Sequence, residues 1–312
     1  MGGWITRRLL AAVPVMIGIT FVAFCLASLS PSDPAEVALR IHMVVPTPEV
    51  IAQTRTEMGL DDPFLLRYAH WLTDALQGNL GCSWATGRPV AEELSLALPP
   101  TLALAGTALA LILLFSLSAG ILAAKYEGRW LDRLIRGGLF LTTSTPAFWA
   151  GLLLVWLFSV RLGWLPTSGM GSPGSVLLPA LTLSLAYTGT YARLIRANLI
   201  AAREQGFSTY CRALGLRPRT VTRHQLMNSL ASSITALGMS IPKLVAGSFA
   251  VECIFAWPGL GRLAVTSIFG RDYPVIQAYV LLIATLFLAF NLASDIANAW
   301  LDPRQREDGE KP

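Results

Sequence analysis

Long uncharged runs of apolar residues constrain the fold of this sequence more than any other feature. A helix needs about 20 mostly apolar residues to cross the hydrocarbon core of a bilayer. Runs of this kind cover residues 9–32, 94–124, 137–160, 176–192, 229–251 and 273–294, the fifth being interrupted by Pro242-Lys243. The sequence therefore predicts an all-α, polytopic membrane protein with six transmembrane helices.

The composition supports this interpretation. Charged residues make up only 14% of the chain and hydrophobic residues 54%, whereas soluble domains carry about 25% charged residues. Intrinsic disorder is excluded because it requires low hydrophobicity. The first run follows Arg7-Arg8, as a signal peptide would, but it is long for one and lacks a small-residue cleavage site. We therefore expect it to be a transmembrane helix.

The distribution of basic residues predicts the orientation. With the N-terminus inside, the cytosolic segments contain 16 of the 24 Lys and Arg residues and the outer segments contain seven, which leaves Lys243 within a predicted span. An excess of basic residues marks the cytosolic side of a membrane protein. Both termini are therefore expected inside, and the net charge of +5 implies no nucleic-acid partner.

These predictions divide the chain into four parts. They are a cytosolic N-terminus with the first span (1–32), an extracytoplasmic helical domain (33–93), a transmembrane core (94–301) that includes a cytosolic loop (197–228), and a cytosolic tail (302–312). Within the outer domain, helices are expected near 48–58 and 63–76, because Pro48-Glu49 suits a helix N-terminus.

The sequence lacks the motifs of the common enzymes. It contains no GxSxG, no HExxH and no phosphate-binding GK[ST], and its three histidines are far apart. We predict no catalytic residues and no metal site. The four cysteines form no CxxC, and no disulfide is expected. Energy for active transport would have to come from another chain or from an ion gradient.

Three ionisable residues fall inside or directly at the ends of the predicted spans: Lys243, Glu252 and Asp295. Such residues are candidates for a transport path or gate, and equally for hydrogen bonds between helices. Asp295 lies between Asn291 and Asn298 on one polar stripe of a helix. An ion-gradient carrier would typically bury several carboxylates at mid-membrane, so this sequence argues against that class.

The cytosolic loop contains a short segment, 207–216, that favours a helix ending at Gly215. Such a helix could dock into a groove of a partner protein. It could equally be a basic connection held at the anionic inner leaflet.

This segment resembles the coupling loop, or EAA loop, of ABC importer permeases. Residues 209–215 read TYCRALG and residues 223–228 read RHQLMN, where the peptide and nickel branch has RTARAxG followed by RHxxRN. Thr209, Tyr210, Cys211 and Met227 depart from that pattern, and Ser232 stands where a proline is usual.

Further motifs in the same order extend the resemblance over nearly the whole chain. They include DP at 33, GLDDP at 59, GNLG at 78, PAFW at 146, LPTSG at 165, ECIFAWPGLGR at 252, RDYPVIQ at 271 and LDPR at 301. The chain resembles the B-type permease subunit of the dipeptide, oligopeptide and nickel importer family, and most of all the nickel-type permease.

The resemblance implies a type I ABC importer permease fold in the bacterial inner membrane. It also implies a homologous C-type permease partner, two cytosolic ATPase subunits that bind ATP-Mg, and an extracytoplasmic solute-binding protein. No cofactor is expected on this chain. The implied ATPase-coupling residues are Phe207, Thr209, Tyr210, Cys211, Arg212, Ala213, Leu214 and Gly215.

The translocation path is expected between the two permeases. We predict Pro146, Phe148, Trp149, Met239, Lys243, Ser248 and Glu252 near it. Nickel or a metal chelate is the expected cargo, with di- or oligopeptides as the alternative. His42, Met43 and His70 could bind Ni²⁺ outside the membrane, although lone histidines are more often ordinary surface residues.

Overall fold

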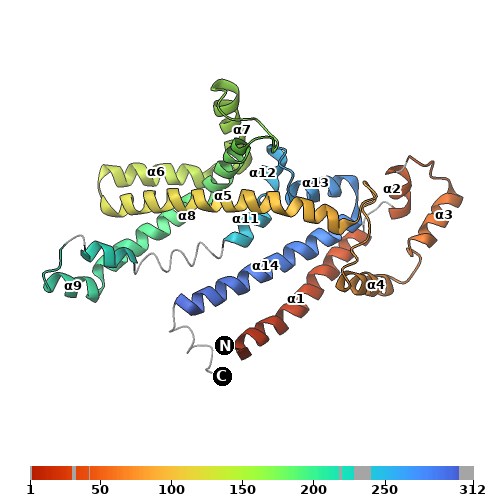
Figure 1. Cartoon of the computed structure of the whole chain (residues 1–312), viewed down its shortest axis with the longest axis horizontal. Coiled ribbons are helices and arrows are strands. Elements are labelled where there is room, and N and C mark those ends of the chain that lie inside the picture. Colours follow the sequence, from red (N-terminus) through yellow and green to blue (C-terminus); the bar gives the residue numbers. More distant parts are fainter. Residues whose placement is uncertain (1, 30–32, 42, 218–219, 228–239, 302–312) are drawn as a thin grey trace. The chain divides into compact units, whose positions relative to one another are not determined.

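The computed structural model describes residues 2–29, 33–41, 43–217, 220–227 and 240–301. Most of these residues are helical, and the described part of the chain contains no β-strand, only an isolated bridge between Cys82 and Pro89. Figure 1 shows the helices of the chain. They divide into two compact units. One comprises residues 1–100 and 258–289, and the other comprises residues 101–257 and 290–312.

The first unit is built from the two ends of the chain. It contains α1 (Gly2–Ser28), α2 (Pro34–Ile41), α3 (Pro48–Glu57), α4 (Phe64–Leu76), the start of α5 (Val90–Lys125), α13 (Leu260–Gly270) and most of α14 (Tyr273–Leu301). Val90 and Leu94 of α5 pack on Leu260 and Val275 in its core. Tyr68 of α4 joins α1 through a hydrogen bond of 2.9 Å between its hydroxyl group and that of Thr20.

The two helices predicted in the outer domain are present as α3 and α4. Thr47 caps α3 by accepting a hydrogen bond from the Val50 N–H, and Pro48 occupies the first turn, where a missing N–H costs nothing. The break between the helices falls at Gly59, whose φ of 64° glycine adopts without strain.

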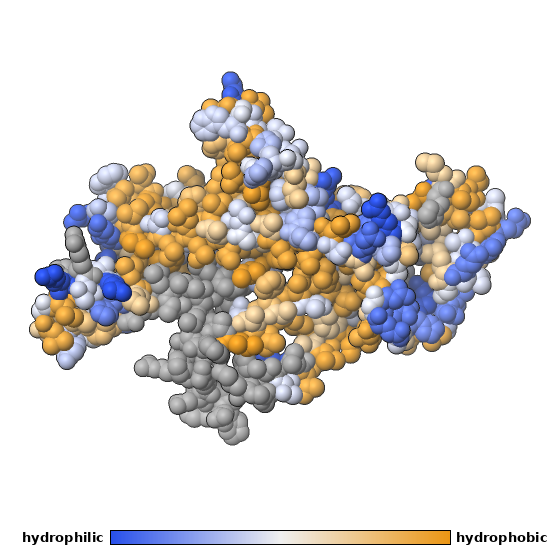
Figure 2. Space-filling model, viewed as in Figure 1, coloured by the Kyte–Doolittle hydropathy of each residue, from blue (hydrophilic) through white to orange (hydrophobic). Residues whose placement is uncertain are grey.

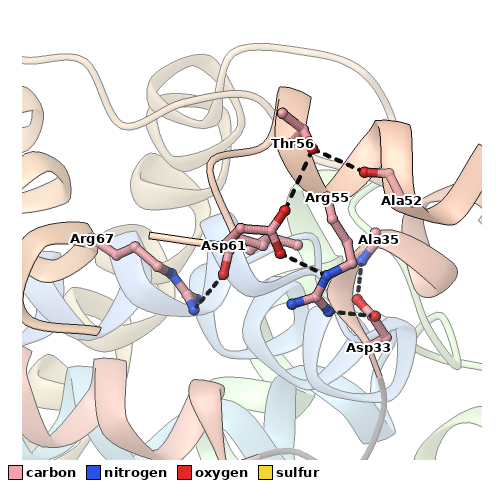
Figure 3. A network of polar contacts seen from close by, with 8 residues as sticks. Asp33, Ala35, Ala52, Arg55, Thr56, Asp61 and Arg67 are labelled. Atoms are coloured by element: carbon pink, nitrogen blue, oxygen red, sulfur yellow. Dashed lines mark hydrogen bonds and ion pairs between the residues drawn. The ribbon is translucent and has the colours of Figure 1, made fainter. Parts of the chain in front are cut away.

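A network of polar contacts holds this break in place (Figure 3). The Arg55 guanidinium binds Asp33 at 2.6 Å and Asp61 at 3.0 Å, and Arg67 donates to the Leu60 carbonyl oxygen. The two carboxylates raise the pKa of Arg55 above its ordinary value. Arg55 thus ties the start of α2 to the connection between α3 and α4.

The second unit contains the remaining helices. They are the rest of α5, α6 (Trp130–Ser144), α7 (Ala147–Leu154), the π-helix η1 (Val155–Arg161), the 3₁₀ turn η2 (Pro173–Val176), α8 (Leu177–Glu204), α9 (Gly206–Ala213), a helix over 220–227, α11 (Ile241–Gly247) and α12 (Phe249–Ile254). Helix α8 packs against both α6 and α7 (Figure 1).

Several of the predicted spans correspond to single long helices. Residues 10–28 of α1, all of α5 and residues 273–294 of α14 are long and apolar enough to cross a membrane. Helix α8 covers the fourth predicted span and continues past it, with Arg193, Arg196 and Arg203 in its second half. Residues 229–239 of the fifth span lie outside the described residues.

The third predicted span is broken in a way that its apolar composition did not indicate. Helix α6 ends at Ser144, and α7 with η1 leaves it at an angle of 106°. The proline at 146 has no N–H to donate, and it forces Thr145 out of the helical region to φ −87° and ψ 126°. Similarly, Lys243 and Glu252 do not share one helix, because α11 and α12 are separated at Ser248.

The surface agrees with a membrane protein. Hydrophobic residues dominate the visible surface of the long helices, whereas hydrophilic residues gather over α3, α4 and α9 (Figure 2). Along α1 the exposed residues include Leu10, Val13, Val22 and Leu26. Apolar side chains exposed along a whole helix are typical of a surface that faces lipid or another membrane-spanning subunit.

Candidate functional site

Helix α9 leaves the end of α8 through a single extended residue. Gln205 has φ −67° and ψ 147°, which ends α8 and turns the chain. Ser208 then folds α9 back, because its backbone N–H donates to the Gln205 carbonyl oxygen and its hydroxyl group donates to the Ala202 carbonyl oxygen at 2.6 Å. The short helix is therefore fixed directly to α8.

A second segment of the predicted cytosolic loop contacts the same residue. Gln225, on the helix over 220–227, donates from Nε2 to the Ser208 hydroxyl oxygen at 3.0 Å, and both side chains are buried. Its neighbour Leu226 packs against Ala124, Ile195 and Leu199. Hydrogen bonds of Ser208 thus join the buried face of α9 to α8 and to the helix over 220–227.

Gly215 ends this segment as the sequence predicts. Its φ of 70° lies in the left-handed region, and the Leu216 N–H reaches back to the Cys211 carbonyl oxygen at 3.3 Å. This is the long hydrogen bond of a Schellman motif, which satisfies a carbonyl group that the helix end leaves unpaired.

Five of the eight predicted coupling residues are exposed on α9 or directly after its end. Thr209, Tyr210, Ala213, Leu214 and Gly215 are exposed, with 65% of Tyr210 and 59% of Leu214 accessible. Phe207 and Cys211 are half-buried, and the side chain of Arg212 lies outside the described part of the structure. An exposed tyrosine and leucine on a firmly held helix are suited to binding a groove on a partner protein.

An ion pair that the sequence did not suggest joins α8 to α6. The Arg196 guanidinium donates from Nε to Asp132 Oδ1 at 2.9 Å and from Nη2 to Oδ2 at 2.8 Å, and the Gly128 N–H also donates to Oδ2. Asp132 is a lone acid among Arg129, Arg133 and Arg136. A single acidic residue among three arginines could have suggested a salt bridge at Asp132. The sequence could not identify Arg196 as the partner.

The predicted path residues Pro146, Phe148 and Trp149 lie at the bend between α6 and α7. All three are exposed. Trp149 lines an apolar cavity of about 230 Å³ with residues of α6 and α8, among them Leu141 and Leu185. The bend therefore presents aromatic side chains outside the packed core of its unit.

The remaining predicted path residues have different surroundings. Glu252 is fully buried, and its Oε1 accepts hydrogen bonds from Thr101 at 2.7 Å and from Ser248 at 2.9 Å. Lys243 is exposed, and its carbonyl oxygen accepts a hydrogen bond from the Tyr187 hydroxyl group. Met239 lies outside the described residues.

Among the described residues, no group of three or more His, Cys, Asp or Glu side chains is arranged to hold a metal ion. Met43 and His70 are exposed, and His42 lies outside the described residues.

Comparisons with known sequences cover nearly the whole length of the chain. Residues 116–307 match the model of the binding-protein-dependent transport system inner membrane component, and residues 1–105 match that of the N-terminal region of the same transport-system membrane component. The chain is 39% identical over 305 residues to the metal-staphylopine import system permease protein CntB of Staphylococcus aureus, covering 97% of this chain and 98% of that protein. It is 37% identical over 311 residues to the glutathione transport system permease protein GsiC of Escherichia coli K12, covering 98% and 99%.

Solved structures support the fold. The inward-facing MetNI methionine ABC transporter matches with a TM-score of 0.58 and 19% identity, covering 67% of this chain and 96% of that one. An amino acid ABC transporter with histidines matches with a TM-score of 0.54 and 19% identity, covering 66% and 92%. The chain therefore belongs to the family of binding-protein-dependent transport system inner membrane components, and it is a multi-pass permease subunit of an ABC importer rather than an enzyme.

Proposed function

We propose that this chain forms half of the translocation path of an ATP-driven importer and that α9 is the helix through which the ATPase acts on it. The observation that carries this proposal is the firm attachment of an exposed apolar face. Tyr210 and Leu214 face outward, while Ser208 on the opposite face is buried against Ala202 and Gln225. A helix held in this way passes a push on its outer face to α8 without bending.

The other subunits follow from the family. The sequence contains no Walker motif, so ATP-Mg is expected on two separate cytosolic ATPase subunits. A C-type permease would supply the other half of the path, and an extracytoplasmic binding protein would deliver the cargo. Residues 33–93 are the segment that we expect to meet the binding protein.

A metal chelate is the cargo that we favour. The Staphylococcus aureus relative is named for import of a metal-staphylopine complex, which supports this assignment. The Escherichia coli relative is named for glutathione transport at nearly the same identity, so a peptide cargo is the second candidate. Uptake measurements decide between the two.

The cargo is tested in cells with and without the gene for this chain. The probes are radioactive nickel supplied as a histidine chelate and a labelled dipeptide. We expect the deletion to abolish uptake of the chelate and to leave dipeptide uptake unchanged. Loss of dipeptide uptake alone would contradict the metal-chelate assignment. Uptake that stops when the ion gradient is collapsed, while cellular ATP is maintained, would contradict ATP-driven transport.

The role of α9 is tested by the substitution Gly215→Pro. Proline cannot adopt the positive φ of this position, so the end of α9 is disrupted. We expect the ATPase subunits no longer to copurify with the permease and transport to be lost. Deletion of Thr209–Leu214 should have the same effect.

Leu177→Ala is the matched control for exposed apolar surface, because this residue lies at the opposite end of α8. It should leave copurification intact. Normal copurification and transport in Gly215→Pro would show that the ATPase docks elsewhere.

A further inference from the structure

We propose that the ion pair between Asp132 and Arg196 carries the movement of α9 to the bend that presents Phe148 and Trp149. This inference rests on the proposed role of α9. It makes Asp132 and Arg196 positioning residues for transport, which act through helices α6 and α8 and touch neither ATP nor cargo.

The pair has the geometry of a strong, oriented link. Both carboxylate oxygens of Asp132 are engaged by one guanidinium group, at 2.9 Å and 2.8 Å. Two parallel charge-assisted hydrogen bonds fix the angle between the groups as well as their distance. The Asp132 side chain is 1% exposed and that of Arg196 is 22% exposed. Solvent therefore screens this pair much less than the exposed pair of Arg203 and Glu127, which are 3.5 Å apart.

On the ATPase side, Arg196 and the attachment point of α9 belong to one helix. Helix α8 is continuous from Leu177 to Glu204, and α9 is fixed to it at Ala202 through Ser208. A displacement of α9 therefore also moves Arg196, because both are attached to the same rigid helix, α8.

Close packing gives α6 and α8 a second point of contact. A Cβ at Gly189 of α8 would lie 2.6 Å from the Leu139 carbonyl oxygen of α6, so the two backbones touch there. Along a helix that rises about 1.5 Å per residue, Arg196 lies about 10 Å and Ala202 about 20 Å from this contact. Arg196 thus lies between this contact and the attachment of α9, and α6 is held to α8 at two points.

On the path side, α6 connects the ion pair to the bend. Asp132 lies in the first turn of α6, and α6 ends at Ser144, directly before Thr145 and Pro146. Because α8 contacts α6 at both Asp132 and Leu139, α6 moves together with α8 and does not slide past it. Its far end then moves the start of α7, which carries Phe148 and Trp149.

The test measures cargo uptake per ATP hydrolysed by the complete importer, reconstituted in lipid vesicles with its binding protein. The cargo is whichever of the two probes, the nickel–histidine chelate or the labelled dipeptide, the wild-type importer takes up. The variants are Asp132→Asn, which removes the charge, and Arg196→Lys, which keeps the charge but cannot make two parallel hydrogen bonds. We expect both to assemble and hydrolyse ATP, with uptake per ATP reduced about tenfold, within the range usual for coupling between distant sites.

Two further variants separate coupling from a structural role. Arg203→Lys alters the exposed pair on the same helix and should leave uptake per ATP within about twofold of the wild type. The double variant Asp132→Glu with Arg196→Lys restores an ion pair with a longer carboxylate arm and should recover part of the loss seen in Arg196→Lys alone. A merely structural role would change assembly or thermal stability and leave uptake per ATP unaltered.

The outcomes also distinguish this proposal from the one on which it rests. Wild-type uptake per ATP in Arg196→Lys, with transport abolished by Gly215→Pro, would overturn the role of the ion pair and leave the role of α9 intact. If Gly215→Pro also transports normally, the proposed coupling through α9 is itself wrong. Should Asp132→Asn fail to assemble, Arg196→Lys and its double variant decide the matter, because both retain the charges.

Discussion

At the scale of single residues, Glu252 illustrates how a charged group is accommodated in an apolar chain. Its carboxylate is completely buried, and the hydroxyl groups of Thr101 and Ser248 both donate to Oε1. Burying a carboxylate is costly unless hydrogen bonds compensate for the water it loses. The two donors come from α5 and from the junction between α11 and α12, so these contacts also join helices distant in sequence.

This arrangement predicts the effect of Thr101→Val, which preserves the shape of the side chain and removes its hydrogen bond. The buried carboxylate would lose one donor, and the free energy of unfolding should fall by about 1–3 kcal/mol. Chemical unfolding of the purified permease in detergent measures this change.

Thr107→Val is the control on the same helix, because its hydroxyl group donates only to the local Ala103 carbonyl oxygen among the contacts described. It should change the free energy of unfolding by less than about 0.5 kcal/mol. Equal effects of the two substitutions would mean that the Thr101 contact with Glu252 adds nothing to stability.

At the scale of helices, glycines set how closely α8 approaches its neighbours. Gly189 lies against Leu139 and Thr143 of α6, and Gly120 of α5 lies against Ala192 and Ile195 of α8. Side chains larger than hydrogen at these positions would separate the helices. The Asp132–Arg196 pair lies on the same side of α6 as this contact and depends on the same spacing.

We therefore expect Gly189→Ala to push α6 away from α8. The new methyl group would overlap the Leu139 carbonyl oxygen, and the free energy of unfolding should fall by about 1–3 kcal/mol. Thermal unfolding of the purified protein is the measurement.

Gly138→Ala provides the comparison, because this glycine lies in α6 with no atom within 4 Å of the added methyl group. Alanine has the higher helix propensity, so this variant should be stabilised by up to about 1 kcal/mol. A loss of stability in Gly138→Ala as large as that in Gly189→Ala would show that the α6–α8 approach is not the cause.

The sequence predicts the positions of some helices better than those of others. Apolar runs and proline positions were sufficient to locate α1, α3, α4, α5 and α14, because each of these signals is local. The sharp turn between α6 and α7 was missed, although Pro146 was visible in the sequence. A proline within a membrane-spanning run can kink a helix or end it, and only the packing of the neighbouring helices selects between these outcomes.

At the scale of the whole molecule, the sequence is sufficient to identify the family, whereas the orientation in the membrane stays a prediction. Charge asymmetry predicts orientation because basic residues are retained on the cytosolic side, and the order of the motifs identified the permease family that the comparisons confirm. The contacts that support α9 were not accessible. Arg196 lies 64 residues from Asp132 and Gln225 lies 17 from Ser208, and no local pattern records such pairs.

Cross-linking is the most direct test of whether α9 contacts the ATPase. A photoreactive amino acid replaces Tyr210 on the exposed face of α9. In a control protein it replaces the similarly exposed Trp164, which lies between the third and fourth predicted spans, on the side that the predicted orientation places outside. The importer is irradiated in its membrane, and the products are identified by mass. We expect position 210 to cross-link to the ATPase subunit and position 164 not to. Absence of the ATPase from the products of position 210, in an importer that still transports, would show that α9 does not contact the ATPase.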